Sequence, residues 1–98
     1  MNFGMFTDFH VRRGMSQPEA FDESFRQVVE AEQMGIDTVW LAEHHFSPER
    51  SVLASPLIIA SAIAARTSTI RVGLAVQVFP LTNPLRIAEE AATVDQVS

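Results

Sequence analysis

Residues 37–46 read DTVWLAEHHF, and this stretch decides the fold. Its centre, TVWLA at 38–42, consists of β-branched, aromatic and aliphatic residues without polar alternation, which is typical of a strand covered on both faces. Strands of this kind belong to parallel sheets. The polar residues Glu43, His44 and His45 follow at once. A buried strand that ends in a polar loop predicts an α/β fold.

On the N-terminal side, the apolar run at 2–6 predicts a first strand, and a helix is expected to begin after Ser16. Ser16 and Glu19 form the S-x-x-E pattern of a capping box, and Pro18 falls in the first turn, where a missing N–H is tolerated. Gly35 is the expected stop of this helix.

On the C-terminal side, Ser55 and Pro56 predict the cap and first residue of a helix with the sequence PLIIASAIAARTS. Residues 70–76 predict a third strand. Asn83 and Pro84 repeat the start signal, and the helix after them is expected to continue to the end of the chain.

The predicted order is therefore βαβαβα, with connections long enough for right-handed crossovers between parallel strands. A doubly wound sheet and a (β/α)₈ barrel both have this pattern. The glycine motifs of dinucleotide and nucleotide-phosphate sites are missing from the first βα connection, which favours the barrel by elimination. We expect residues 1–98 to be a single incomplete domain, the N-terminal βαβαβα part of a (β/α)₈ TIM barrel.

Composition excludes several classes of function. The chain has 7 basic and 12 acidic residues, a net charge of −5 and no basic cluster, so nucleic acid is not an expected partner. It has no cysteine, and its N-terminus lacks the order of a signal peptide, which predicts a cytoplasmic protein. The most apolar run, 51–65, is shorter than the ~20 residues of a membrane span, so no membrane partner is expected.

The predicted second helix is apolar around nearly its whole circumference, with Ser61 as its only polar side chain between 56 and 65. Small residues on one side, Ala60, Ala64 and Ala65 among them, would let another helix approach closely. We infer a helix-mediated subunit contact. The alternative is that neighbouring elements of the same chain cover this side.

In parallel βα proteins the functional groups lie in the loops after the strands. His10, His44 and His45 all fall in such loops. A metal site is not expected, because it would need three converging ligands and adjacent residues rarely supply two of them. From composition alone, a structural histidine pair is the better interpretation, although an imidazole at a strand end is the best acid–base candidate.

Other residues near the strand ends have two interpretations each. Glu43 is expected either to pair with Arg50 or another loop cation, or to contact a ligand at the pocket mouth. Four phenylalanines could line an apolar pocket or simply pack: Phe6, Phe9, Phe46 and Phe79. These residues alone predict a pocket with a histidine.

Three segments together resemble the bacterial luciferase-like flavin-dependent monooxygenases. They are DTVWLAEHHF at 37–46, IRVGLAVQVFPLTNPLRIAEEAA at 70–92 and VDQVS at 94–98, preceded by the M-x-F-G start at residues 1–4. The similarity covers essentially the whole chain in the right order. The E-H-H-F and N-P-L-R-I-A-E-E combination is the specific part, since barrel packing demands neither.

The resemblance implies that reduced FMN binds at the C-terminal mouth of the barrel and, with O₂, oxidises a small and hydrophobic organic substrate. His44 matches the family's catalytic histidine, and Glu43 matches a residue beside the flavin. Ala75 and Val76 match a cofactor-binding position where family members often have a non-prolyl cis peptide. In this family, helices corresponding to 55–67 and 83–97 form a dimer interface.

The resemblance leaves three functions open. Nothing in the chain looks like a nicotinamide site, so the monooxygenase would use flavin from a separate flavin reductase. A deazaflavin-dependent hydride-transfer oxidoreductase is the second possibility, although E-H-H-F favours FMN over the S-D-H-F of that branch. A non-catalytic flavin-binding paralogue is the third. Family members continue with further strands that help to hold the flavin, so 98 residues alone are not expected to bind FMN tightly.

Overall fold

The computed structural model describes residues 1–98 and contains a three-stranded sheet and three α-helices. The elements in chain order are β1 (Gly4–Thr7), α1 (Gln17–Gln33), β2 (Thr38–Leu41), α2 (Pro56–Ala64), β3 (Arg71–Leu74), the short 3₁₀ turn η1 (Phe79–Leu81) and α3 (Pro84–Val97). This order confirms the predicted βαβαβα arrangement. No helix combines the length and the apolar character that crossing a membrane requires.

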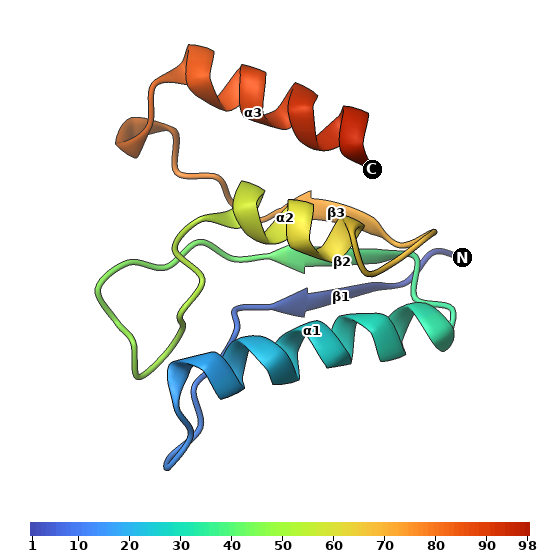
Figure 1. The fold of residues 1–98 in the computed structure, drawn as a ribbon, viewed down its shortest axis with the longest axis vertical. Coiled ribbons are helices and arrows are strands. Elements are labelled where there is room, and N and C mark those ends of the chain that lie inside the picture. Colours follow the sequence, from blue (N-terminus) through green and yellow to red (C-terminus); the bar gives the residue numbers. More distant parts are fainter.

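The three strands are parallel and lie in the order β1-β2-β3. Thr7, Leu41 and Leu74, the last residues of the strands, are in register with one another. The strands therefore end at one edge of the sheet, where the loops that follow them gather (Figure 1). The prediction of a parallel sheet is confirmed.

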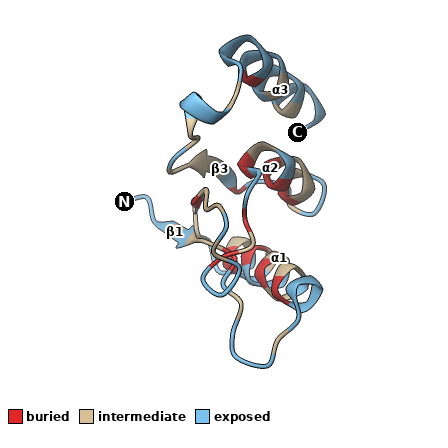
Figure 2. Ribbon diagram, turned by 90° about the vertical axis from the view of Figure 1, so that its left-hand side faces the viewer, coloured by how far each residue is buried: buried red, intermediate tan, exposed pale blue.

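The helices lie on one side of the sheet, as the side view shows (Figure 2). The expectation that β2 is covered on both faces is therefore wrong within these residues. Val39 and Leu41 point to the helices and are fully buried, whereas Trp40 between them points to the other face and is 44% exposed. Successive side chains of a strand alternate between the faces, so a sheet with helices on one side buries only every second residue.

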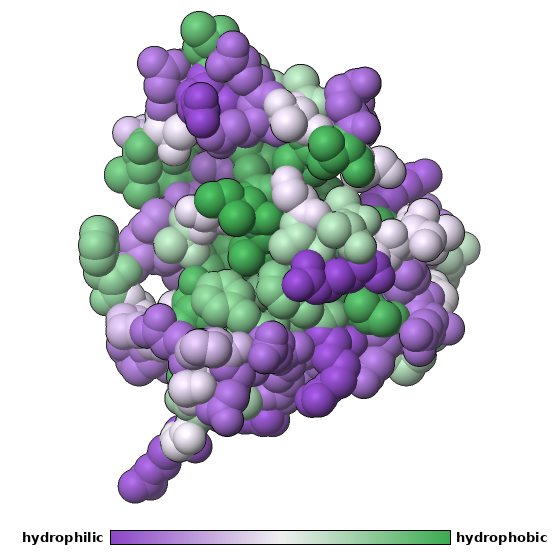
Figure 3. Space-filling view, viewed as in Figure 1, coloured by the Kyte–Doolittle hydropathy of each residue, from purple (hydrophilic) through white to green (hydrophobic).

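Part of the small-residue side of the second helix faces α3 of the same chain, whereas Ala65 is exposed. Ala60 and Ala64 line one cavity together with Ala91 and Val94 of α3. α3 of the same chain thus lies across a cavity from these two alanines. Ile58, on another side of α2, remains 69% exposed. A band of hydrophobic residues crosses this face of the molecule between the more hydrophilic surfaces of α1 and α3 (Figure 3).

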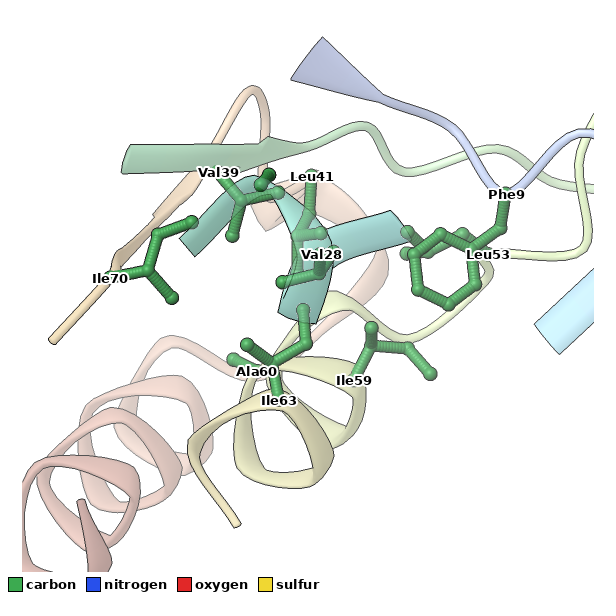
Figure 4. Packing of buried hydrophobic residues seen from close by; sticks show 10 residues of the cluster. Phe9, Val28, Val39, Leu41, Leu53, Ile59, Ala60, Ile63 and Ile70 are labelled. Carbon is green, nitrogen blue, oxygen red and sulfur yellow. The ribbon is translucent and has the colours of Figure 1, made fainter. Parts of the chain in front are cut away.

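The core lies between the sheet and helices α1 and α2 (Figure 4). It combines residues from every layer: Phe9, Val28, Ala31, Val39, Leu41, Leu53, Ile59, Ala60, Ile63 and Ile70. Leu53 comes from the loop between β2 and α2 and is fully buried. That loop is therefore part of the core. Burial of a leucine side chain contributes about 1.5–3 kcal/mol to stability.

Trp40 lies against the sheet between two glycines of the neighbouring strands. A Cβ atom on Gly4 of β1 would lie 2.9 Å from the indole Nε1, and one on Gly73 of β3 would lie 2.5 Å from Cζ3. Neither distance leaves room for a methyl group. The two glycines thus allow the indole to lie flat on the face that has no helix.

The helix boundaries follow the sequence signals in α1 and α3. Ser16 and Glu19 form the predicted capping box, and Gly35 has the left-handed φ of +86° that suits the residue after a helix. Asn83 Oδ1 accepts from the Leu85 amide at 2.9 Å. Ser55 occupies the N-cap position of α2, but its side chain makes no capping hydrogen bond.

The α2 helix ends at Ala64, earlier than its sequence predicts, and the loop a few residues further on is held by α1. One carboxylate oxygen of Glu32 on α1 accepts from the amides of Ser68, Thr69 and Ile70 at 2.8, 2.6 and 2.9 Å. These backbone donors stabilise the ionised carboxyl and lower the pKa of Glu32 from 4.5 to about 2. Glu32 thereby fixes the loop that leads into β3, at the edge of the sheet opposite to the carboxyl ends of the strands.

Candidate functional site at the carboxyl ends of the strands

Two of the loops after the strands are joined by hydrogen bonds. The Val52 amide donates to the Phe9 carbonyl at 3.2 Å, and the buried Ser51 hydroxyl donates to the carbonyl of Asp8. His10 Nδ1 lies 2.8 Å from the Arg50 carbonyl, which can only accept, so Nδ1 carries the proton. The loop after β1 and the loop after β2 therefore form one continuous rim.

The four phenylalanines of this region do not form one cluster. Phe9 is fully buried, with its ring edge-on to Phe21 and Phe25 of α1 at centroid distances of 5.7 and 5.4 Å. Phe9 is therefore a core residue, despite a left-handed φ of 52°. The other three are exposed: Phe6, Phe46 and Phe79.

Glu43 follows β2 and its side chain is only 3% exposed. One carboxylate oxygen lies 2.6 Å from His45 Nε2, and the other accepts from the Val78 amide at 2.8 Å. The expected pairing with Arg50 is absent, and Glu43 contacts His45 instead. Both oxygens of Glu43 are used within the chain, and one of them connects the loop after β2 with the loop after β3.

His44 lies between these two residues in sequence but takes no part in their contact. Its backbone amide donates to the Leu53 carbonyl at 2.9 Å, which fixes its position along the loop. Its ring is partly exposed and makes no hydrogen bond within the chain. His10 and His45 both have a partner for one ring nitrogen, so His44 is the histidine of these loops whose ring has none within the chain.

The loop after β3 has an unusual backbone next to this histidine loop. The Ala75 amide donates to the Leu41 carbonyl at 2.7 Å, and the peptide bond between Ala75 and Val76 is cis, as the resemblance implied. The Val76 side chain is 65% exposed. Gln77 Oε1 is buried and has no hydrogen-bond donor within the chain.

The structure contains no group of three or more His, Cys, Asp or Glu side chains that could hold a metal ion. The loops after β2 and β3 contain the buried carboxylate of Glu43 and the partner-free ring of His44. They also contain the side-chain oxygen of Gln77, which is buried and has no donor within the chain.

Part of this arrangement was missed from the sequence. Residues two apart on an extended chain share a side, so the alternation that separates His44 from His45 also places Glu43 next to His45. The contact with Val78 had no comparable signal, because 35 residues separate it from Glu43. The buried Ser51 likewise gave no pattern that distinguishes it from an ordinary loop serine.

Known proteins are similar to this chain over its whole length. It is 41% identical to an uncharacterized protein (y4vJ) of Sinorhizobium fredii and 35% identical to the alkanal monooxygenase alpha chain of Photorhabdus laumondii. Both alignments cover 100% of the chain, which spans only 28% and 27% of these relatives.

The fold is also that of solved flavin enzymes. The oxygenating constituent of 3,6-diketocamphane monooxygenase from Pseudomonas putida, a structure in complex with FMN, superposes with a TM-score of 0.88 at 25% identity, over 99% of this chain and 26% of that one. The model of the family described as luciferase-like monooxygenase matches residues 1–98. The βαβαβα arrangement matches the N-terminal part of the TIM-barrel enzymes of this family. The chain therefore belongs to the luciferase-like monooxygenases.

Proposed function

We propose that the protein is a monooxygenase that uses reduced FMN and O₂ to oxidise a small hydrophobic organic substrate. The observation that carries this proposal is that the loop with the partner-free His44 ring is joined to the loop of residues 75–78 at the carboxyl ends of the strands, through the bond from the Val78 amide to Glu43. Family membership and the FMN complex of a structural neighbour support a flavin as the cofactor. We further propose that residues 1–98 are one incomplete domain, the first three βα units of the barrel.

The residues at the strand ends fit a flavin ring. An isoalloxazine has broad apolar faces and a rim of N–H donors and carbonyl acceptors. The buried Gln77 Oε1 needs a donor that the chain does not supply, and the exposed Val76 offers an apolar surface next to it. Reduced FMN, when bound, supplies the electrons with which O₂ is activated.

The chain's own residues have distinct roles in this proposal. His44 exchanges a proton with the bound flavin or substrate, and the backbone of Ala75 and Val76 lies against the ring. Glu43 is beside the cofactor as part of the same loop contact. The exposed aromatic rings of Phe6, Phe46 and Phe79 support an apolar substrate.

Two partners belong to the proposal. A separate flavin reductase would supply the reduced FMN, because no nicotinamide motif is present in the sequence. A second copy of the chain would pack on helices 55–67 and 83–97. The exposed Ile58 on α2 and the hydrophobic band across this face support such a dimer (Figure 3). An Ile58→Asp variant tests it by the sedimentation coefficient, which should fall to that of a monomer.

The test uses the product of the complete gene. Reduced FMN is titrated anaerobically, and O₂ consumption and oxidised product are then measured with a panel of aldehydes and cyclic ketones. We expect His44→Ala to lower the oxidation rate by about 10²–10⁴-fold, the usual contribution of a general acid–base group, with little change in FMN affinity. The control is His10→Ala, because the His10 ring already donates to a backbone carbonyl.

Three outcomes would overturn the proposal. Hydride transfer from a reduced deazaflavin without O₂ consumption would identify the deazaflavin-dependent enzyme. FMN binding without any oxidation would identify a non-catalytic paralogue. Equal losses in the His44→Ala and His10→Ala variants would remove His44 from its role in proton exchange.

A further inference from the structure

The loop after β3 is pinned to the end of β2 at two points. The Ala75 amide donates to the Leu41 carbonyl at 2.7 Å, and the Val78 amide donates to Glu43 at 2.8 Å. The residues between these two anchors are the cis Ala75–Val76 peptide and Gln77. The position of this short segment relative to β2 therefore depends on one backbone contact and one side chain.

The Glu43 carboxylate is held in place by hydrogen bonds to two different loops. Its side chain is 3% exposed, and a buried carboxylate is costly unless hydrogen bonds compensate for the lost water. His45 Nε2 at 2.6 Å and the Val78 amide provide these bonds from two different loops. Hydrogen bonds to a charged group are among the stronger ones in proteins, so the geometry is well defined.

We propose that Glu43 is a positioning residue, which acts on the flavin site through the Val78 amide and does not contact the flavin with its carboxylate. Both carboxylate oxygens already have partners, and the side chain is only 3% exposed, so little of the carboxylate is accessible to a bound ring. The inference rests on the proposed function, since it concerns the backbone of 75–78 as a surface for the flavin ring. The role of His45 is to hold the second oxygen of Glu43.

The test compares three variants of the complete gene product. Glu43→Ala removes both contacts, whereas Glu43→Gln keeps an acceptor for Val78 without the charge. The matched control is Glu32→Ala, because Glu32 also fixes a loop through backbone amides but does so at the opposite end of the sheet. The readouts are hydrogen–deuterium exchange of peptides that contain Val78 or Ser68–Ile70, and FMN affinity from quenching of flavin fluorescence.

Loss of a hydrogen bond to a charged group changes an equilibrium constant by about tenfold or more. We expect Glu43→Ala to speed exchange at Val78 and to weaken FMN binding by about tenfold or more. Glu43→Gln should restore both to within about threefold of the unmodified protein, because the Val78 amide keeps its acceptor. Glu32→Ala should speed exchange at Ser68–Ile70 and leave FMN affinity unchanged.

Two results would overturn the inference. Glu43→Gln that binds FMN as poorly as Glu43→Ala, with normal exchange at Val78, would indicate a direct contact of the charge. Equal FMN losses for Glu43→Ala and Glu32→Ala would indicate a general effect on stability. If the unmodified protein binds no FMN, the proposed function fails, whereas exchange at Val78 still decides whether Glu43 positions this segment.

Discussion

Glu32, one residue before the end of α1, accepts a hydrogen bond from the amide of Ile70, the residue that precedes β3, at 2.9 Å. The amides of Ser68 and Thr69 donate to the same oxygen. One carboxylate oxygen thus serves as the hydrogen-bond acceptor for three consecutive backbone amides of the loop that leads into β3. It is also the group whose ionisation the fold perturbs most, with its pKa lowered from 4.5 to about 2.

This lowered pKa predicts a loss of stability in acid. The unfolded chain binds the Glu32 proton more readily than the folded one, so the stabilisation is complete above about pH 4.5 and is lost as the pH falls towards about 2. Urea unfolding at a series of pH values measures the effect. A Glu32→Gln variant should lose less free energy of unfolding across this window, and parallel curves for the two proteins would contradict the prediction.

Substitution of Gly73 by alanine is expected to displace the Trp40 ring. The new Cβ would lie 2.5 Å from Trp40 Cζ3, and overpacking of this kind costs about 1–3 kcal/mol. Trp40 is the only tryptophan, so a shift of its fluorescence maximum reports the displacement directly. A second variant that also carries Trp40→Ala should tolerate Gly73→Ala without further loss in urea unfolding, and an undiminished loss would exclude the ring as the cause.

The two serines at helix N-caps predict different responses to alanine. Ser16 accepts from the Glu19 amide in a capping box, which also lowers the pKa of Glu19, so Ser16→Ala should lower the free energy of unfolding by about 1 kcal/mol. Ser55 makes no side-chain capping bond, and Ser55→Ala should change stability by less than about 0.5 kcal/mol. Urea unfolding compares both variants, and equal losses would show that the capping box contributes nothing specific.

Ser51 predicts a stability loss from a loop position. Its hydroxyl donates to the Asp8 carbonyl and accepts from the Leu53 amide at 3.1 Å, and the residue is buried. Ser51→Ala leaves both groups without this partner and should cost about 1–3 kcal/mol. Ser61→Ala is the control, because the Ser61 hydroxyl only donates to a carbonyl of its own helix. A loss for Ser51→Ala no larger than for this control would count against the bond.

The strands and helices were predictable because their signals are local. The apolar run at 38–42 identified β2, and the Ser16 and Asn83 caps marked the starts of two helices. The predicted end of α2 was too late: the helix stops at Ala64, and the amides of residues 68–70 donate to Glu32, which is distant in the chain. Local pattern therefore predicted the element order, but not the residue at which α2 ends.

The candidate site divides in the same way. The position of His44 at a strand end followed from the pattern of βα units, and the cis peptide at Ala75 followed from resemblance alone. Trp40 had no signal for its place on the open face, which depends on glycines in two other strands. The two contacts of Glu43 required both kinds of information, one from alternation along the chain and one from the fold.

The joined rim has a consequence for protein engineering. The Asp8 and Phe9 carbonyls receive their donors from residues 51 and 52, and the Arg50 carbonyl receives its donor from His10. Transplanting either loop alone from a relative would separate acceptors from their donors, even if each loop were compatible with the barrel. The two segments are therefore one unit of exchange, and a chimaera should inherit them as a pair.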